Sequence, residues 1–293
     1  MTWVSWRQSR ASALALVILV ALLAAYLIPT GLSQRTAFDT GGLARCLLPA
    51  DQQNHSCRTA LADFYRISNG SGRMLVEYLR LVPAFLGVFL GAPLLARELE
   101  QGTHQLVWTQ SITRTRWVTI RLLLAGLIAL AGAQAVSMVI TFWRAPLDQL
   151  TGRFDPGAYS LEGIVPTAYA LFAFTVGTAA GVVIRRTVPA MAVTLGVYLA
   201  VRITLEDLAR PRFLPAQTIT YLDKPPAQTP SGSAGDWILD TQTPKPGLGL
   251  PTIVTYQPAD RYWTFQLLEA GICIAAAAAL IALTVHWTRR RVR

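Results

Sequence analysis

The sequence predicts an all-α membrane protein: a bundle of six transmembrane helices with both termini cytoplasmic, two long outer loops and a short helix in one cytoplasmic loop. Three observations lead to this fold class. Only 14% of the 293 residues are charged and 53% are hydrophobic, whereas soluble domains carry about 25% charged residues. Six apolar stretches approach the roughly 20 residues that a helix needs to cross a bilayer. Arginines gather on one side of these stretches.

The six predicted spans are Ala11–Ile28, Glu77–Ala96, Val118–Phe142, Ile164–Ile184, Val188–Ile203 and Trp263–Val285. The fifth is the shortest, and because only three residues join it to the fourth, these two helices must be antiparallel neighbours. The first span could also be read as a cleaved signal peptide, but its apolar core is longer than usual for one and five spans follow. We therefore expect a single membrane domain over residues 1–293, with loops at 29–76, 97–117 and 204–262.

The arginines predict the orientation. On one side they are Arg7, Arg10, Arg97, Arg114, Arg116, Arg121, Arg185, Arg186, Arg289, Arg290, Arg291 and Arg293. Only Glu98 and Glu100 oppose them, so this side carries the whole formal net charge of +10, and the charges of the other side cancel. Positively charged loops stay in the cytoplasm. Both termini and loop 97–117 are thus predicted to be cytoplasmic, in a protein of the cell membrane. The excess of basic residues therefore indicates how the spans are oriented, and it does not indicate a nucleic-acid partner.

The first outer loop contains Cys46 and Cys57. Outside the cytoplasm a disulfide can persist, and closing so short a loop stabilises by about 3 kcal/mol in the chain-entropy model. Two unpaired thiols are the alternative. In the last outer loop, Thr204–Ala209 suits a short helix, which Pro211 would end. The middle of this loop, Lys224–Gly249, has few apolar residues and is expected to be mobile.

Chemistry-bearing residues are scarce in the spans. Apart from Arg121 at the inner end of the third span, the charged residues in the spans are four that lie near the outer ends: Glu77, Arg80, Arg202 and Glu269. Arg80 and Glu269 could pair across helices, or each could reach toward outer water. We expect no polar cluster at one membrane depth, no metal-ligand spacing and no phosphate-binding loop. These features argue against a proton-driven transporter and a membrane-embedded enzyme, and they imply that any energy input comes from a partner.

Glycine pairs recur at helix-packing spacing in two spans. Gly87 and Gly91 lie one turn apart in the second, as do Gly177 and Gly181 in the fourth. Such spacing lets helix backbones approach closely. Because such spacing is frequent in any bundle, it supports helix association without identifying a dimer face.

The cytoplasmic loop Ala96–Trp117 is too long for a turn. After Gly102, Thr103 can cap a two-turn helix over Thr103–Gln110 that carries Leu106, Val107 and Trp108. A short capped helix with exposed apolar side chains can dock into a cleft on a partner protein and transmit force to the two helices that it joins. An interfacial helix without a partner is the alternative.

Three segments resemble the permease subunits of ABC exporters of the type-2 class, particularly the short actinobacterial ones. They are WVSWRQSR at the start, APLLARELEQGTHQLVWTQSITRTRW around the second span and loop 97–117, and LARPRFLP after the fifth span. The six-span plan and the large loop before the last helix also fit. One departure is Ser111-Ile112, which stands where the family often has a proline-containing break.

The resemblance implies a non-catalytic half-transporter that pairs with a second copy or a sister permease. It also implies that two soluble ABC ATPase subunits bind the chain and carry ATP and Mg²⁺, with no cofactor on this chain. The matching residues in the coupling region are Glu98, Glu100, Gly102, Thr103, Leu106 and Trp108. The bare spans favour a lipophilic cargo. A non-transporting sensor or assembly scaffold is the alternative, and its mark would be a structured outer domain in Thr204–Tyr262.

Overall fold

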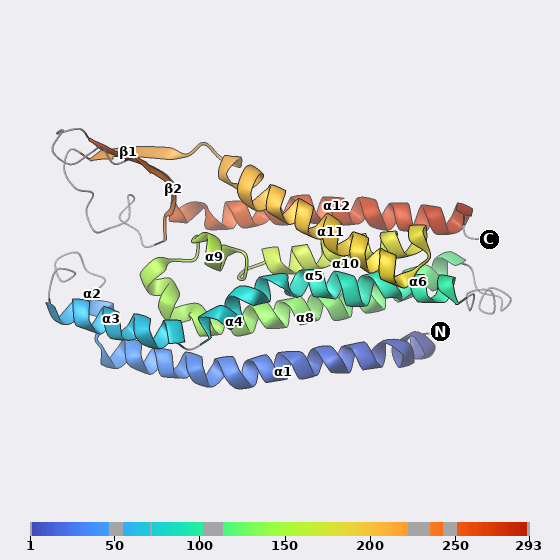
Figure 1. Ribbon diagram of the computed structural model, residues 1–293, viewed down its shortest axis with the longest axis horizontal. Coiled ribbons are helices and arrows are strands. Elements are labelled where there is room, and N and C mark those ends of the chain that lie inside the picture. Colours follow the sequence, from blue (N-terminus) through green and yellow to red (C-terminus); the bar gives the residue numbers. More distant parts are fainter. Residues whose placement is uncertain are drawn as a thin grey trace.

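A computed structural model describes residues 2–46, 55–70, 72–101, 114–221, 235–242 and 251–291. The molecule is an elongated bundle of helices, and both termini lie at the same end of it (Figure 1). We call this the terminal end. The opposite end, where a helical hairpin and a small sheet extend from the bundle, is the distal end.

The helices are α1 (Thr2–Thr40), α2 (Leu43–Cys46), α3 (His55–Gly70), α4 (Arg73–Tyr78), α5 (Val82–Leu86), α6 (Ala92–Glu100), α8 (Arg114–Thr151), α9 (Pro156–Tyr159), α10 (Val165–Ile184), α11 (Thr187–Ile203) and α12 (Tyr262–Arg291). The 3₁₀ turns are η1 (Leu79–Leu81), η4 (Arg210–Arg212) and η5 (Ala259–Arg261), and the π-helical segments are η2 (Gly87–Gly91) and η3 (Thr204–Ala209). The strands are β1 (Gln217–Tyr221), β2 (Trp237–Gln242) and β3 (Thr252–Gln257).

Within the described residues, six helical stretches are long and apolar enough to cross a membrane, which confirms the six predicted spans. They are Arg10–Thr40, Arg73–Glu100, Val118–Thr151, Val165–Ile184, Thr187–Arg212 and Ala259–Thr288. The protein is thus a multi-pass membrane protein, and several helices continue past the apolar stretches at the distal end.

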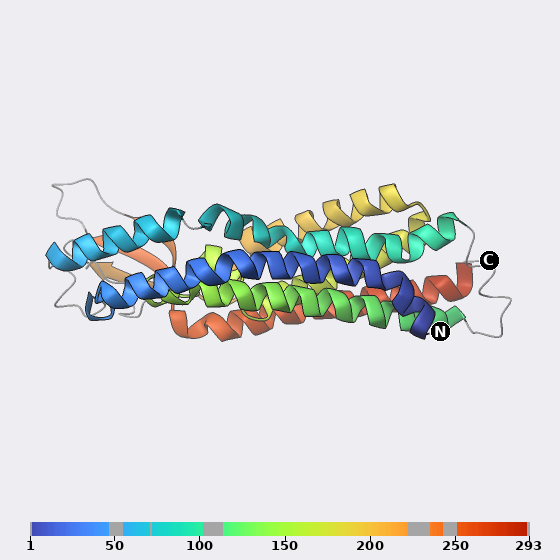
Figure 2. The ribbon, with the colours of Figure 1, turned by 90° about the horizontal axis from the view of Figure 1, so that it is seen from below.

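The longest extensions belong to α1 and α8, which lie side by side (Figure 2). Past the predicted end of the first span, Trp143 Nε1 donates to Thr30 Oγ1 at 3.1 Å and Arg35 donates to the Phe142 carbonyl at 3.2 Å. Gly31 lies against the Trp143 backbone, where an added Cβ would come within 3.2 Å of the Trp143 Cα. These contacts explain why both helices continue beyond the residues that hydropathy selects.

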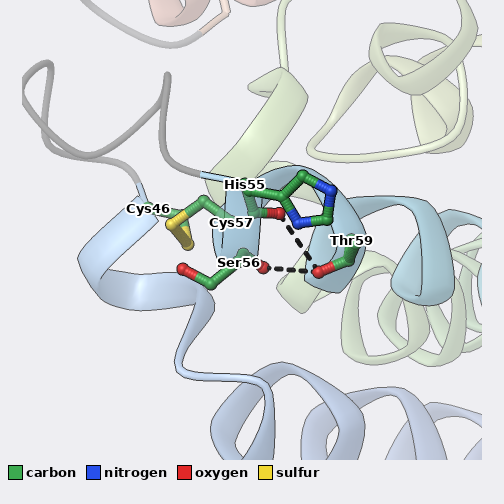
Figure 3. The surroundings of a disulfide bond; sticks show 5 residues. All are labelled: Cys46, His55, Ser56, Cys57 and Thr59. Carbon is green, nitrogen blue, oxygen red and sulfur yellow. Dashed lines mark hydrogen bonds between the residues drawn. A yellow bond between two sulfur atoms is a disulfide. The ribbon is translucent and has the colours of Figure 1, made fainter.

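A disulfide joins the end of α2 to the first turn of α3, as the cysteine pair predicted. The Cys46 and Cys57 sulfurs lie 1.98 Å apart and their Cα atoms 5.5 Å apart (Figure 3). Beside the bond, Thr59 Oγ1 donates to the carbonyls of His55 and Ser56 in the first turn of α3. The distal end of α1 shares a small core with α2 and α3, formed by Phe38, Leu43, Cys46, Cys57 and Phe64, and Leu147 and Leu150 of α8 pack against it.

Helix α10 is the most enclosed of the spans, between the second span and α12. The two glycine pairs face each other here. A Cβ added at Gly177 would lie 2.5 Å from the Gly87 carbonyl oxygen, and one at Gly91 would lie 2.5 Å from the Phe174 oxygen. Only glycine permits backbones to pass this closely. The helix-packing motifs therefore serve contacts within the chain.

The distal end also carries a three-stranded antiparallel sheet in the order β1-β3-β2, which the all-α expectation missed. The register pairs Ile219 with Val254 on one side of β3 and Trp237 with Gln257 on the other. Trp237 packs edge-on against Phe154 and Phe265, so the sheet rests on the aromatic distal ends of the bundle. The short helix expected at Thr204–Ala209 is present as η3, continuous with α11.

Candidate functional site

The second and third spans are joined at the terminal end, directly before the loop in which a coupling helix is predicted. Glu98 near the end of α6 forms an ion pair with Arg121 of α8, and both side chains are largely buried, at 15% and 9% exposure. Arg121 also donates to the Leu94 carbonyl at 3.3 Å. Removing one partner of a buried charge pair strongly destabilises a protein. The Glu98–Arg121 pair therefore holds α6 and α8 together.

Glu100 joins the same region to the fifth span. Its Oε2 accepts from the Thr187 backbone N–H at 3.0 Å and from Thr187 Oγ1 at 2.7 Å. Thr187 is the first residue of α11, where backbone N–H groups lack partners within the helix and a negative charge is favourable. The Glu100 side chain therefore caps the N-terminus of α11, although Glu100 is distant from that helix in the sequence.

Glu98 and Glu100 thus bring three spans together: α6, α8 and α11. We call these contacts the terminal brace. The other residues of the predicted coupling region, Gly102, Thr103, Leu106 and Trp108, lie outside the described residues, as does the helix predicted over Thr103–Gln110. Arg121 and Thr187 were not selected from the sequence, because nothing local marks a cap or an ion pair that forms between different spans.

A second polar site lies at the distal ends of α10, α11 and α12. Arg210 of η4 makes a bidentate contact with Glu269 of α12, at 2.8 Å from Nε to Oε2 and 2.7 Å from Nη2 to Oε1. The Tyr169 hydroxyl donates to Glu269 Oε1 at 2.6 Å. The side chains of Arg210 and Glu269 are 1% and 0% exposed. We call this group, together with Arg202 and Glu206, the distal ion cluster.

Arg202 and Glu206 extend the distal ion cluster toward the second span. Arg202 lies 3.5 Å from Glu206, and it donates to the Tyr198 hydroxyl at 3.0 Å and to the Arg80 carbonyl at 3.3 Å. The pairing of Arg80 with Glu269 considered from the sequence is wrong, because Arg210 holds both carboxylate oxygens of Glu269. The expectation that the chain has no polar cluster at one depth is also wrong. Arg210 was missed because the sequence places it in a loop.

A third cluster joins α8 to the segment that leads back into α10. Arg144 Nε donates to Glu162 at 3.0 Å and Arg144 Nη2 lies 3.3 Å from Asp148. Arg153 lies 3.6 Å from Asp148 and 3.5 Å from Glu162. Burial raises the pKa of Glu162 to about 8, and the nearby Asp148 carboxyl adds to the rise. We call these four residues the α8 ion cluster.

The charges are therefore arranged at the two ends of the bundle. The terminal brace ties the second, third and fifth spans at one end, and the two ion clusters tie all spans except α1 at the other. Ionic networks of this kind fix the relative positions of helices and require concerted rearrangement when the helices move.

Comparison with known families accounts for most of this bundle. Residues 17–210 match the sequence model of the family described as ABC-2 membrane transporter related. The match runs from α1 through η4 and includes the terminal brace, and it covers about two thirds of the chain. No curated protein and no solved structure matches the chain. A family match of this extent, on a chain with six membrane-crossing helices, assigns the protein to the ABC-2 membrane transporter related family.

Proposed function

We propose that this chain is the permease subunit of an ATP-driven exporter in the cell membrane. It pairs with a second copy or a sister permease and moves a lipophilic substrate by alternating access. A soluble ABC ATPase, which carries ATP and Mg²⁺, binds the cytoplasmic loop 97–117, so the terminal end faces the cytoplasm. The distal end, with its disulfide, faces the outside.

The observation that carries this proposal is the terminal brace. A partner that pushes on loop 97–117 acts on α6 and α8 together through the Glu98–Arg121 pair. The same push reaches α11 through Glu100 and Thr187. Three spans therefore respond to one docking site, which is what a transporter driven from outside its own chain requires. The family match supports the same function.

The test uses the full chain co-expressed with its ATPase and reconstituted in liposomes. Deleting residues 103–110 should leave the protein inserted in the membrane, and it should abolish both co-purification of the ATPase and substrate-stimulated ATP hydrolysis. A deletion of residues 224–231, which lie between β1 and β2 in the sequence, is the matched control and should change neither. If the 103–110 deletion leaves hydrolysis unchanged, the proposal fails. Labelling of a cysteine placed at position 106 from the outside of intact cells would refute the orientation.

A non-transporting sensor is the second candidate, and the distal sheet favours it. Gln257 Nε2 donates to the Leu214 carbonyl at 2.8 Å and Arg261 donates to the Pro215 carbonyl at 2.8 Å, so the sheet is fixed to the bundle. A ligand that binds the sheet would be sensed by the helices. Purification without any ATPase, together with ligand binding that is lost when the sheet is removed, would favour this function over transport.

A further inference from the structure

A cleft of about 330 Å³ opens on the side of the bundle between α8 and the start of α12. On α8 it is lined by Gln134, Ser137 and Thr141, which share one helix face because they are separated by three and four residues. The cleft is also lined by Arg153, Glu162 and Trp263. The cleft is distinct from the terminal brace and from the distal ion cluster.

The depth of the cleft follows from the length of α8. In the sequence, the apolar run of this span begins at Val118, after Arg114 and Arg116. A helix crosses the hydrocarbon core in roughly 20 residues, so the core ends close to Met138. Trp263 lies at the start of α12 with 55% of its surface exposed, and tryptophan favours the headgroup boundary. The cleft therefore lies where the acyl chains meet the headgroups, in the leaflet at the distal end.

The charged group that the cleft presents is Arg153. In the α8 ion cluster, the side chains of Arg144, Asp148 and Glu162 are at most 10% exposed, whereas that of Arg153 is 47% exposed. Its shortest carboxylate contacts are made by Nε, at 3.5 and 3.6 Å. Ser137 Oγ is already used as a donor to the Leu161 carbonyl at 3.1 Å. The arginine is thus the cation available to an acceptor that enters from the membrane.

An apolar track on α8 begins at the cleft, which Met138 also lines, and runs toward the terminal end. Leu127 and Met138 are 64% and 62% exposed, and their spacing of eleven residues places them on the face that also carries Gln134. The distance between them along the helix is about 16 Å, close to half of the roughly 30 Å hydrocarbon core. An acyl chain of one leaflet matches this length.

We propose that this cleft binds an anionic phospholipid of the leaflet at the distal end. The phosphate contacts the Arg153 guanidinium at the headgroup boundary, Trp263 flanks the glycerol region, and an acyl chain follows α8 past Met138. Arginine suits this role because it forms strong charge-assisted hydrogen bonds to phosphate oxygens. The site concerns lipid binding by the chain itself and does not depend on transport or on an ATPase.

The experiment measures lipid binding to the purified full chain in detergent by native mass spectrometry. Phosphatidylglycerol should bind more tightly than phosphatidylcholine, and Arg153→Gln should weaken phosphatidylglycerol binding about tenfold. Arg153→Lys should recover part of the loss. Arg66→Gln is the matched control, because Arg66 lies on α3, is 82% exposed and is not among the residues that line the cleft, and this variant should bind as the unchanged protein does.

Met138→Trp provides a test that leaves the α8 ion cluster intact, since the exposed Met138 has room for a larger side chain. It should also weaken phosphatidylglycerol binding, by obstructing the acyl track. Equal binding of the two lipids, or equal losses in Arg153→Gln and Arg66→Gln, would overturn the proposal. So would competition by millimolar inorganic phosphate that removes the lipid preference, because the site would then recognise the free anion.

Discussion

The Arg210–Glu269 pair shows at the scale of single residues how a span end is fixed. Glu269→Gln removes the negative charge but retains the shape of the side chain, and it leaves Arg210 buried without its main partner. Breaking a buried pair in this way costs about 3–5 kcal/mol. We expect a fall in Tm of roughly 6–12 °C for a domain of this size, measured by thermal unfolding in detergent.

Two further variants separate the ion pair from general damage. Arg210→Met combined with Glu269→Gln should cost less than the sum of the two single changes, because neither charge then lacks a partner. Glu77→Gln breaks the Arg73–Glu77 contact, whose side chains are 63% and 52% exposed, and it should change Tm very little. Additive effects of the two buried substitutions would show that the pair does not act as a unit.

Glu162 makes stability depend on pH. Its pKa is raised from the ordinary 4.5 to about 8 by burial and by Asp148, although Arg144 and Arg153 oppose the rise. The folded protein therefore binds more protons than the unfolded chain between about pH 4.5 and 8, so stability falls as the pH rises through this window. Thermal unfolding between pH 5 and 8 should show this slope, and Glu162→Gln should reduce it. Asp207→Asn, at an exposed position of η3, should leave it unchanged.

At the scale of elements, the crossing of α10 over the second span depends on missing side chains. A Cβ at Gly177 would lie 2.5 Å from the Gly87 oxygen and 2.7 Å from the Ala92 nitrogen, both of them backbone atoms that cannot turn away. Gly177→Ala should force the helices apart and lower Tm. Gly196→Ala is the matched control on α11, because its Cβ would meet nothing within 4 Å. It should be neutral or stabilising by up to about 1 kcal/mol, and a similar loss in both variants would contradict the close crossing.

The elements also show what the sequence could and could not reveal. Hydropathy located all six spans, because each must contain enough apolar residues to cross the bilayer by itself. Hydropathy underestimated the lengths of α1 and α8, because the distal extensions of these helices are stabilised by contacts between helices, such as that of Trp143 with Thr30. The strands were missed although Gln217–Tyr221 alternates in the manner of a strand, because Pro- and Gly-rich loops surround it.

At the scale of the whole molecule, the sequence could not predict which residues form contacts when they are distant from each other in the chain. Glu98 and Glu100, at the end of α6, were selected as coupling residues from family resemblance, but their partners Arg121 and Thr187 emerge only when the bundle is assembled. Arg210 and Glu269 are separated by 59 residues, and no local pattern connects them. The composition of the spans indicated a bundle with little charge, whereas the fold gathers its few charges into clusters that tie the helix ends.

The last prediction concerns how the terminal brace transmits movement from the predicted coupling loop to α11. Thr187→Val removes the hydroxyl that donates to Glu100 at 2.7 Å and leaves the backbone contact at 3.0 Å in place. If the proposed ATPase moves α11 through this contact, the variant should still co-purify with that ATPase. Substrate-stimulated ATP hydrolysis should fall by about half or more, in line with the loss of a hydrogen bond to a charged group.

Thr187→Ser is the control for this prediction, because serine retains the hydroxyl and should preserve stimulated hydrolysis. Loss of ATPase binding in Thr187→Val would mean that Thr187 shapes the docking surface and does not transmit movement. Full stimulation in Thr187→Val would mean that α11 is driven by another route, through α6 and α8 alone. In that case the terminal brace would position the helices but would not transmit movement to α11, because weakening the Glu100–Thr187 contact would leave ATP hydrolysis unchanged.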